Sequence, residues 1–447
     1  MTEYDKSQEH GLTSATEGNS RLSALILDAW QRTRMDWGFV SDRLAALFRK
    51  ERRLASRERR YVAETVYGMV RHLRRIDTAL RAGGLTSGNH APDRARLLAY
   101  QVLEQGLPVE RATQRMPALD WGRVAAIDDR IARETDLAER IGLRHSLPDW
   151  LARVLVADLG ERADALAQAL NQRAPMTIRV NTLRTNVENV RNELADAGIE
   201  TDSGDFADTA VHLTTRTNLF GLPSFKQGHF EAQDQGSQLI AALVAPPPKA
   251  RVVDYCAGAG GKTLALAALM GNRGRIVATD IDRRKLEELA RRARRAGVSN
   301  VQRAHLDDGW PRALTDLEGK AHRILLDVPC SGLGALRRNP EARWRLRPDD
   351  LERLPRQQLE ICRQAASLTA PGGRLIYATC TVLARENQNV VTAFLDEHEN
   401  FQLMPVKAIW GRERAAPIAD ADGHYLSVGP DRQGTDGFFA AVLRRVE

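Results

Sequence analysis

The chain has 447 residues, of which 43% are hydrophobic and 28% are charged, and its net charge is +7 with a pI near 9.4. This length predicts two or three domains with real hydrophobic cores, and the positive excess suggests an anionic partner. The four cysteines form no C-x-x-C pair and are too few for a disulfide scaffold, and no histidine cluster has zinc spacing, so we expect reduced cytoplasmic thiols and no metal site.

The N-terminal third of the chain is predicted to be helical. Residues 1–20 are polar, lack the apolar core of a signal peptide and are expected to form a disordered tail. From 21 to 146 the apolar residues recur at helical spacing, and we find no strand alternation there. The stretch from Arg49 to Arg81 holds eleven Lys and Arg against four Asp and Glu. This stretch is either a solvated helix face or a surface that contacts phosphates.

A small α/β module is predicted for residues 147–232. Two helical stretches are followed by MTIRVNTLR, which reads as a strand, and by the amphipathic helix NVENVRNELADAG, which ends at Gly198. The basic residues Arg179 and Arg184 flank the strand.

Residues 233–447 alternate between strand-like and helical stretches. The expected strands are RVVDY, RIVATD, VQRAHL, HRILLD, RLIYATC and FFAAVLRR, and no stretch between them is long and apolar enough to span a membrane. Such alternation predicts an α/β, Rossmann-like domain with a mostly parallel, doubly wound sheet. Ligands of such sheets bind beyond the carboxyl ends of the strands.

The first strand of this region leads into the glycine-rich turn CAGAGGK. Its glycines allow a tight turn and a close approach to a ligand, but its spacing fits neither a Walker A loop nor the dinucleotide fingerprint. The next strand ends at Asp280, about twenty residues after the turn, where a carboxylate can accept ribose hydroxyls. The expected cofactor-binding residues of the turn are Cys256, Ala257, Gly258, Ala259, Gly260, Gly261 and Lys262.

Further acids follow the later strands, at Asp307 or Asp308 and at Asp327. Several carboxylates at adjacent strand ends would repel the phosphates of NAD or ATP. They suit a ligand that carries an adenosine, a positive sulfonium and an amino group, and S-adenosylmethionine has all three. We therefore expect S-adenosylmethionine as the cofactor.

Two cysteines end apolar strands, Cys330 in DVPCSG and Cys380 in YATC. C5 of a cytosine is a poor nucleophile until a thiolate adds to C6, and a second group then helps to release the product. Two thiols in one cleft meet both needs, although spacing alone does not assign them. Cys362 lies among apolar residues of a predicted helix and is expected to be a packing residue, which is the common role of a free cysteine.

The motifs DYCAGAGGKT, LLDVPCSGLGALRRNPEARWR, YATCTVLARENQNVV and DGFFAAVLRR resemble the signatures of the Sun/NOP2 family of RNA cytosine-5 methyltransferases. They span about Gln233 to Arg444. The stretch RERRYVAETVYGMVRHLRRID is similar to the NusB-like RNA-binding domain of the bacterial 16S rRNA members, and residues 147–232 to an RRM-like module.

The resemblance implies a role for each site residue. Cys380 would attack C6, Cys330 would assist product release, and Asp327 would hydrogen-bond the base close to the cofactor. The turn would hold the methionine part of the cofactor and Asp280 its ribose. For the third acid the family pattern favours Asp308 over Asp307, because a glycine follows.

Two positions depart from the family pattern. Ala259 stands where a proline is usual, which loosens the turn, and Thr381 stands where a serine is usual. DNA cytosine methyltransferases use the proline–cysteine thiol as nucleophile, so the order of the two thiols rests on the RNA family's motif.

The function that the resemblance implies is methylation of a cytosine at C5 in 16S rRNA, free or in a small-subunit assembly intermediate. We expect a cytoplasmic monomer without membrane attachment. Three alternatives stay open: the same chemistry on tRNA or another rRNA site, a non-catalytic RNA-binding assembly factor, and a small-molecule or protein methyltransferase. The last two would not need two thiols at strand ends.

Overall fold

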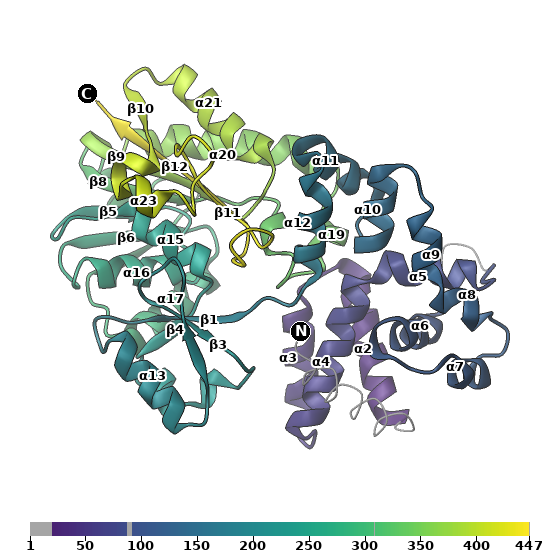
Figure 1. The fold of residues 1–447 in the computed structure, drawn as a ribbon. Helices are drawn as coiled ribbons and strands as arrows, with labels where there is room; N and C mark the ends of the chain where they lie inside the picture. Colours follow the sequence, from purple (N-terminus) through teal and green to yellow (C-terminus); the bar gives the residue numbers. More distant parts are fainter. Residues whose placement is uncertain (1–19, 87–91, 308, 447) are drawn as a thin grey trace. The chain divides into compact units, whose positions relative to one another are not determined.

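The computed structural model describes residues 20–86, 92–307 and 309–446 of the chain (Figure 1). Residues 1–19 of the predicted tail and Asp308 therefore lie outside the described residues. The chain forms two compact units, one of residues 1–172 with 336–348 and one of residues 173–335 with 349–447. These units divide the chain after residues 172, 335 and 348. The domain boundaries predicted after residues 146 and 232 stay predictions.

The first unit is built from helices, as the spacing of its apolar residues predicts. Its core is formed by side chains such as Trp30, Val62, Met69, Ile76 and Trp121, which are almost fully buried. Such a core supplies most of the stability of short helices. The helices are α2 (Ser20–Asp36), α3 (Val40–Lys50), α4 (Ser56–Arg71), α5 (Leu73–Ala82), α6 (Asp93–Gln105), α7 (Val109–Arg115), α8 (Trp121–Ala125), α9 (Ile127–Ala132), α10 (Leu137–His145), α11 (Asp149–Leu159), α12 (Arg162–Asn171) and α19 (Ala342–Arg345).

Residues 336–348 join this unit although they come late in the sequence, and their helix α19 lies beside α12 (Figure 1). Arg343 is fully buried, and its Nη1 donates to Oδ1 of Asn171 at 2.8 Å. Burial lowers the pKa of Arg343 to about 9. The indole of Trp344 donates to the carbonyl of Val70 at 2.8 Å. These contacts make the inserted segment part of the helical core.

The second unit contains a small antiparallel sheet with strand order β2-β3-β1-β4. Helix α13 packs on it through Val190 and Leu194, which are buried with Ile178 and Phe230 of the sheet. The helix begins where the side chain of Asn186 accepts from the next turn, and Gly198 follows its end with a φ of +73°. The elements are β1 (Met176–Val180), α13 (Val187–Asp196), β2 (Thr201–Ser203), β3 (Ala210–Leu213), η1 (Leu219–Gly221), α14 (Pro223–Lys226) and β4 (Phe230–Ala232).

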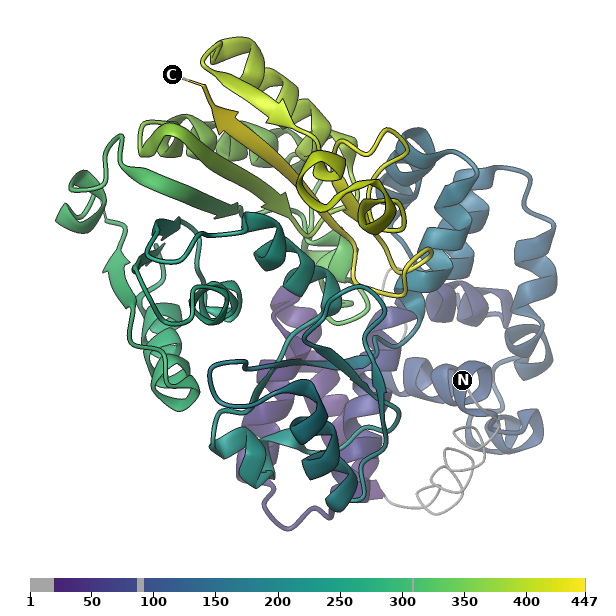
Figure 2. The ribbon, with the colours of Figure 1, turned by 60° about the vertical axis from the view of Figure 1, so that its left-hand side comes forward.

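The larger sheet has the order β10-β12-β9-β8-β5-β6-β7, with β11 paired to β12. The five strands from β9 to β7 are parallel, and β12 lies antiparallel between β9 and β10, as the yellow C-terminal strand in Figure 2 shows. The strands are β5 (Arg251–Asp254), β6 (Arg275–Asp280), β7 (Val301–His305), β8 (Ala321–Asp327), β9 (Thr369–Thr379), β10 (Phe401–Met404), β11 (Leu426–Val428) and β12 (Phe438–Arg445).

Both faces of this sheet are apolar, because neighbouring residues of one strand belong to different cores. Val252 and Leu325 pack under α15 and α16, whereas Val253 and Leu326 pack under α20 and α21. Helices on both faces explain why the strands read as continuous apolar runs, and the predicted doubly wound, Rossmann-like fold is confirmed. The remaining helices are α15 (Gln235–Val244), α16 (Gly261–Leu269), α17 (Arg283–Ala296), α18 (Arg312–Thr315), η2 (Leu333–Ala335), α20 (Asp350–Ala366), η3 (Ala384–Glu386), α21 (Gln388–Glu397), α22 (Val406–Trp410) and α23 (Arg412–Ala415).

Candidate active site

The site lies at the carboxyl ends of neighbouring strands of the larger sheet. From β9 to β6 these ends carry Cys380, Asp327, the turn after Asp254, and Asp280. Because the strands are parallel, residues that are far apart in the sequence, from Asp254 to Cys380, meet at one edge. The structure thus brings the predicted thiols, acids and glycine-rich turn into one region of the second unit.

The glycine-rich turn exposes its backbone to the space above the sheet. Gly258 has a φ of +56°, and a Cβ atom added there would meet no atom within 4 Å. Gly260 has a φ of +83° and precedes the first turn of α16, where a Cβ would collide with Leu289. Both glycines are therefore needed for the backbone conformation, and Gly258 leaves open space for a ligand.

Asp280 holds the turn in place from the end of β6. Its Oδ2 accepts from the amide of Gly258 at 2.8 Å, and its Oδ1 accepts from the amide of Asp282 at 2.8 Å. Each carboxylate oxygen keeps a further lone pair for a ligand. The side chain is almost fully buried, so its direction is fixed.

Asp254 is a site residue that the sequence did not single out. It ends β5 directly beneath the turn and is 1% exposed. Its Oδ2 accepts from the hydroxyl of Thr263 at 2.6 Å, whereas its Oδ1 has no hydrogen-bond partner in the described part of the chain. Burial raises the pKa of Asp254 to about 7, with a further contribution from Asp327. An acid so placed favours a cationic ligand, which would satisfy the free oxygen.

Arg292 of α17 ties the turn to the small sheet. Its Nη1 donates to the carbonyl of Ala259 at 2.8 Å, and its Nε and Nη2 lie 3.2 and 3.1 Å from Oε2 of Glu231 on β4. Glu231 is 3% exposed and also bonds Arg295 at 2.5 Å. Buried Arg179 lies near this pair, and burial lowers its pKa to about 10. The predicted flanking residue Arg179 is therefore internal.

Lys262 links the turn to Asp327. Its Nζ lies 2.7 Å from Oδ2 of Asp327 and sits 5.4 Å from the ring centroid of Phe438. Burial alone would lower the pKa of Lys262, but Asp327 outweighs it and raises the pKa overall, with a smaller contribution from Cys380. A lasting positive charge therefore stands next to the thiol pair.

The sulfurs of Cys330 and Cys380 are 3.4 Å apart. The loop that carries Cys330 is anchored to the other thiol's backbone, since the amide of Gly334 donates to the carbonyl of Cys380 at 2.9 Å. The hydrogen bond to Cys380, followed by burial, raises the pKa of Cys330 well above its usual value. Cys330 therefore keeps its proton at neutral pH.

Glu386 is a second site residue that the sequence did not single out. It is fully buried behind the thiols, where its Oε2 accepts from the amide of Ser331 at 2.8 Å and from Gln358 at 3.0 Å. Its Oε1 accepts from the hydroxyl of Thr381 at 3.2 Å. Ser331 and Thr381 also bond each other at 2.7 Å, so the residues that follow both thiols share one anchor.

Comparison with known proteins places this geometry in a family. A sequence model of the 16S rRNA methyltransferase RsmB/F family matches residues 241–444, and one of the ferredoxin-like domain of RsmF/B-like methyltransferases matches residues 147–219. The probable ribosomal RNA small subunit methyltransferase B of Synechocystis sp. is 30% identical over 88% of this chain and 92% of its own. The chain belongs to the RsmB/F methyltransferase family. The predicted family is therefore confirmed.

A second relative agrees with this family, and a solved structure shares the fold. The ribosomal RNA small subunit methyltransferase B of Thermus thermophilus is 31% identical over 87% of this chain and 89% of its own. The crystal structure of PH0851 superposes with a TM-score of 0.76 at 26% identity, covering 94% of this chain and 97% of that one. S-adenosylmethionine is the cofactor of this methyltransferase. The open space at Gly258 leaves room for it, and the unpartnered oxygen of Asp254 suits one of its positively charged groups.

Asp307 and Cys362 lie apart from this arrangement, whereas Cys256 begins the glycine-rich turn. Asp307 is exposed, bonds Arg283 at 3.3 Å and pairs with His305. Cys362 is buried in the core under the larger sheet. Burial, together with Asp327, Asp254 and Asp280, raises the pKa of the Cys256 thiol well above its usual value, which leaves its sulfur protonated.

The basic stretch of the helical unit divides into two classes of arginine. Arg74 bonds Glu139 at 2.8 Å, and Arg75 bonds Asp128 at 2.9 Å. Arg59 donates to the carbonyl of Leu54 at 3.0 Å. The exposed arginines of this stretch are Arg49, Arg52, Arg53, Arg57, Arg60 and Arg81.

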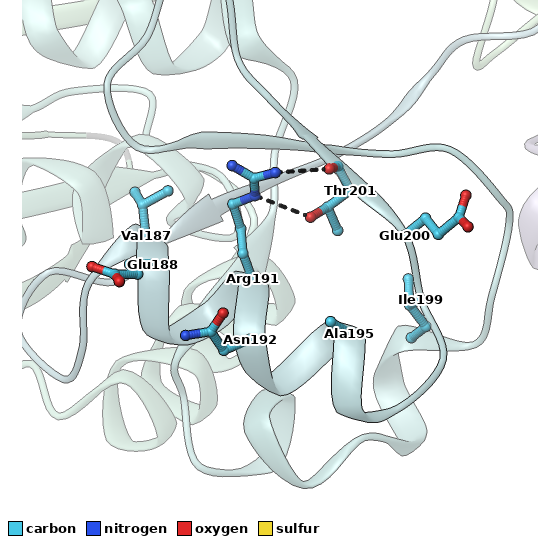
Figure 3. Close-up of a pocket in the computed structure, with 8 residues that line it drawn as sticks. All are labelled: Val187, Glu188, Arg191, Asn192, Ala195, Ile199, Glu200 and Thr201. Carbon is cyan, nitrogen blue, oxygen red and sulfur yellow. Dashed lines mark hydrogen bonds between the residues drawn. The ribbon is translucent and has the colours of Figure 1, made fainter.

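A separate surface pocket of about 550 Å³ lies between α13 and β2 (Figure 3). Arg191 crosses it and bonds the hydroxyl and the carbonyl of Thr201 at 3.3 and 3.1 Å. No predicted site residue lines this pocket.

Among residues 20–86, 92–307 and 309–446 there is no group of three or more side chains that could hold a metal ion. Over the same ranges no helix has both the length and the hydropathy of a membrane span.

Proposed function

We propose that this chain transfers a methyl group to C5 of a cytosine in 16S rRNA through a covalent cysteine adduct at C6. The relatives' names support the substrate, since both are ribosomal RNA small subunit methyltransferases. The observation that carries the chemistry is the 3.4 Å separation of the Cys330 and Cys380 sulfurs beside the cofactor turn.

Cys380 is proposed as the nucleophile. The raised pKa of Cys330 keeps a proton on that thiol, which is in reach to hydrogen-bond the sulfur of Cys380. The ammonium of Lys262 adds a positive charge nearby. These features place a hydrogen-bond donor and a positive charge beside the Cys380 sulfur, which would add to C6 as the thiolate.

The adduct changes the electron distribution of the base. Formation of the sulfur–C6 bond breaks the C5–C6 double bond and makes C5 electron-rich. S-adenosylmethionine, when bound, supplies a methyl group on a positive sulfur for C5 to accept. A water molecule then takes the C5 proton, the C5–C6 double bond forms again and the sulfur–C6 bond breaks. The Cys330 thiol assists by donating a hydrogen bond to the Cys380 thiolate that leaves.

The acids of the site are proposed to hold the two ligands. Asp327 lies between the turn and the thiols and would hydrogen-bond the base edge, with its second oxygen held by Lys262. Asp280 would bind the ribose of the cofactor, and the turn from Cys256 to Lys262 its methionine part. Asp254 would face the cationic end of the cofactor.

The division of labour is tested with Cys380→Ala and Cys330→Ala, incubated with 16S rRNA and the cofactor. Cys380→Ala should neither transfer the methyl group nor form an adduct. Cys330→Ala should transfer it and then stall, leaving a protein–RNA band on a denaturing gel. Cys362→Ala, which removes a buried thiol outside the site, should behave as wild type. The reversed pattern would make Cys330 the nucleophile, and full activity of both variants would remove the thiols from the mechanism.

The substrate is tested separately. Bisulfite sequencing of rRNA from a strain that lacks the protein should show the loss of one 5-methylcytosine in 16S rRNA. Methyl transfer in vitro to naked 16S rRNA, small subunits and tRNA distinguishes the proposed substrate from tRNA. Cofactor binding without transfer to any RNA would instead support the assembly-factor alternative.

A further inference from the structure

Three segments of the second unit meet on the surface of the small module: residues 181–186, residues 214–228, and residues 291–297 at the end of α17. The side chain of Asn181 connects them, because its Nδ2 donates to the carbonyls of Gly228 at 2.8 Å and Ala296 at 2.9 Å. The three segments contain seven Lys and Arg and no Asp or Glu. Their surface is therefore positively charged.

Part of this charge is used inside the fold. Arg292 and Arg295 bind Glu231, and Arg291 pairs with Glu288. Arg216 is exposed but donates to the carbonyl of Ala174 at 3.0 Å. The remaining exposed cations are Arg184, Lys226 and Arg294.

An aromatic side chain stands among these cations. Phe220 is 64% exposed, which is unusual for a large apolar residue. Its ring packs edge-on against Phe225, with centroids 5.0 Å apart, and the guanidinium of Arg295 lies 4.0 Å above the Phe225 ring. Phe220 is therefore supported on its inner side while much of its ring remains in solvent.

The position of Arg184 adds to the same surface. Its guanidinium lies against Gly297, where an added Cβ would come within 2.5 Å of it. Arginines in the last turn of α17 also stabilise the negative end of that helix, which is a sufficient reason for Arg294 and Arg295. It gives no reason for the exposed ring of Phe220 or for Arg184 on a different segment.

We propose that this surface, formed by Phe220, Arg184, Lys226 and Arg294, binds a single-stranded stretch of the RNA substrate. A base would stack on the Phe220 ring while the cations contact phosphates, which is how proteins bind unpaired nucleic acid without reading its sequence. A duplex would not offer an open base face to a single ring. The inference rests on the proposed function for the nature of the substrate, and it adds a contact region outside the catalytic edge.

The test measures binding of the full-length protein to a fluorescent twelve-nucleotide single-stranded RNA and to the matching duplex. Phe220→Ala should weaken single-strand binding about tenfold, and duplex binding much less. Phe220→Trp should restore it, whereas Phe220→Leu, which keeps an apolar side chain without a ring, should not. Leu269→Ala, which truncates another half-exposed apolar residue, is the matched control and should bind as wild type.

A triple Ala variant of Arg184, Lys226 and Arg294 should flatten the dependence of log K on log salt by about 2. Equal affinity of Phe220→Ala and wild type for the single strand overturns the proposal. The proposal is also overturned if polyglutamate displaces the fluorescent RNA as well as unlabelled RNA does, since the surface would then be assigned to an acidic protein. This experiment measures binding and needs no methyl transfer. Loss of binding in Phe220→Ala would therefore support the RNA-binding surface even if the cysteine variants contradicted the proposed chemistry.

Discussion

Replacing Arg292 by Met should weaken cofactor binding although Arg292 does not point to the cofactor. Arg292 holds the carbonyl of Ala259 at 2.8 Å and is itself held by the buried Glu231. Family members usually have a proline at the position of Ala259, which would fix this part of the turn by itself. In this chain the guanidinium takes over part of that restraint, so Arg292 is a positioning residue.

The size of the effect follows from the bond that is lost. A hydrogen bond that involves a charged group contributes about 1.5–3 kcal/mol, which corresponds to roughly 10- to 150-fold in a binding constant. Two other restraints remain, from Asp280 to Gly258 and from the amide of Gly260 to the carbonyl of Ala257. We therefore expect the lower end, about a tenfold rise in the Kd of S-adenosylmethionine.

Isothermal titration of the purified variants with the cofactor measures this change. Arg291→Met is the matched control, because it removes the same charge from the same helix but from an exposed pair with Glu288. Arg292→Lys should fall between wild type and Arg292→Met, since one ammonium cannot match the guanidinium's geometry toward both Glu231 and Ala259. Adding Ala259→Pro to Arg292→Met should recover part of the affinity, because proline fixes φ in the turn.

Arg292 does not position the turn if Arg292→Met binds the cofactor as wild type does while its thermal unfolding is unchanged. This positioning role is also refuted if Arg291→Met shows the same loss, since the effect would then be one of charge and not of the bond to Ala259. A variant that has lost stability in general would show weaker RNA binding as well, so RNA affinity is measured alongside.

Three further predictions concern other parts of the molecule. Asp280→Ala should raise the cofactor Kd by roughly 10- to 150-fold in the same titration and leave RNA affinity unchanged, because it loses charged hydrogen bonds to ribose and to the turn; wild-type binding would remove Asp280 from the site. The pKa of Asp254 rises from 3.8 to about 7 on folding. Between pH 3.8 and pH 7 the folded protein therefore keeps a proton on Asp254 that the unfolded chain has lost. The free energy of unfolding consequently falls as the pH rises through this range. Asp254→Asn lacks this loss, and its unfolding free energy relative to wild type should increase by about 2 kcal/mol between pH 5 and pH 8 in thermal melts; a constant difference would contradict the assignment. Ala at the exposed Arg52, Arg53 and Arg60 should weaken RNA binding and reduce its salt slope by about 2, and an unchanged slope would favour the solvated-face interpretation of this stretch.

The residues of the candidate site at the sheet edge were largely predictable, because strand ends are visible in a sequence. Apolar runs that stop at Asp280, Asp327 and Cys380 give the end of each strand, and a parallel sheet brings such ends together. Asp254 was missed for a physical reason: it also ends a strand, but it stands only two residues before the turn and reads as part of the turn's approach. Only its burial and its unpartnered oxygen distinguish it.

Contacts between distant segments could not be predicted from pattern. Nothing in the sequence around Glu386 indicates that it would hold the residues after both thiols, because an acid after a strand is usually exposed. Arg292 belongs to a basic helix whose arginines look alike, and only the fold turns it toward Ala259. The basic stretch of the helical unit shows the same limit, since Arg52 is exposed while Arg74 is bound to a carboxylate.

The segment 336–348 has a consequence for how the protein can be divided. The chain passes between its two units three times, after residues 172, 335 and 348, so they are not consecutive blocks. A fragment that begins at residue 173 would keep Arg343 and Trp344 but lose the carbonyls that they bind. The guanidinium and the indole would then be exposed to solvent without these partners. A single crossover between two genes cannot replace one whole unit by the corresponding unit of a relative. We therefore expect the two units to be inherited together.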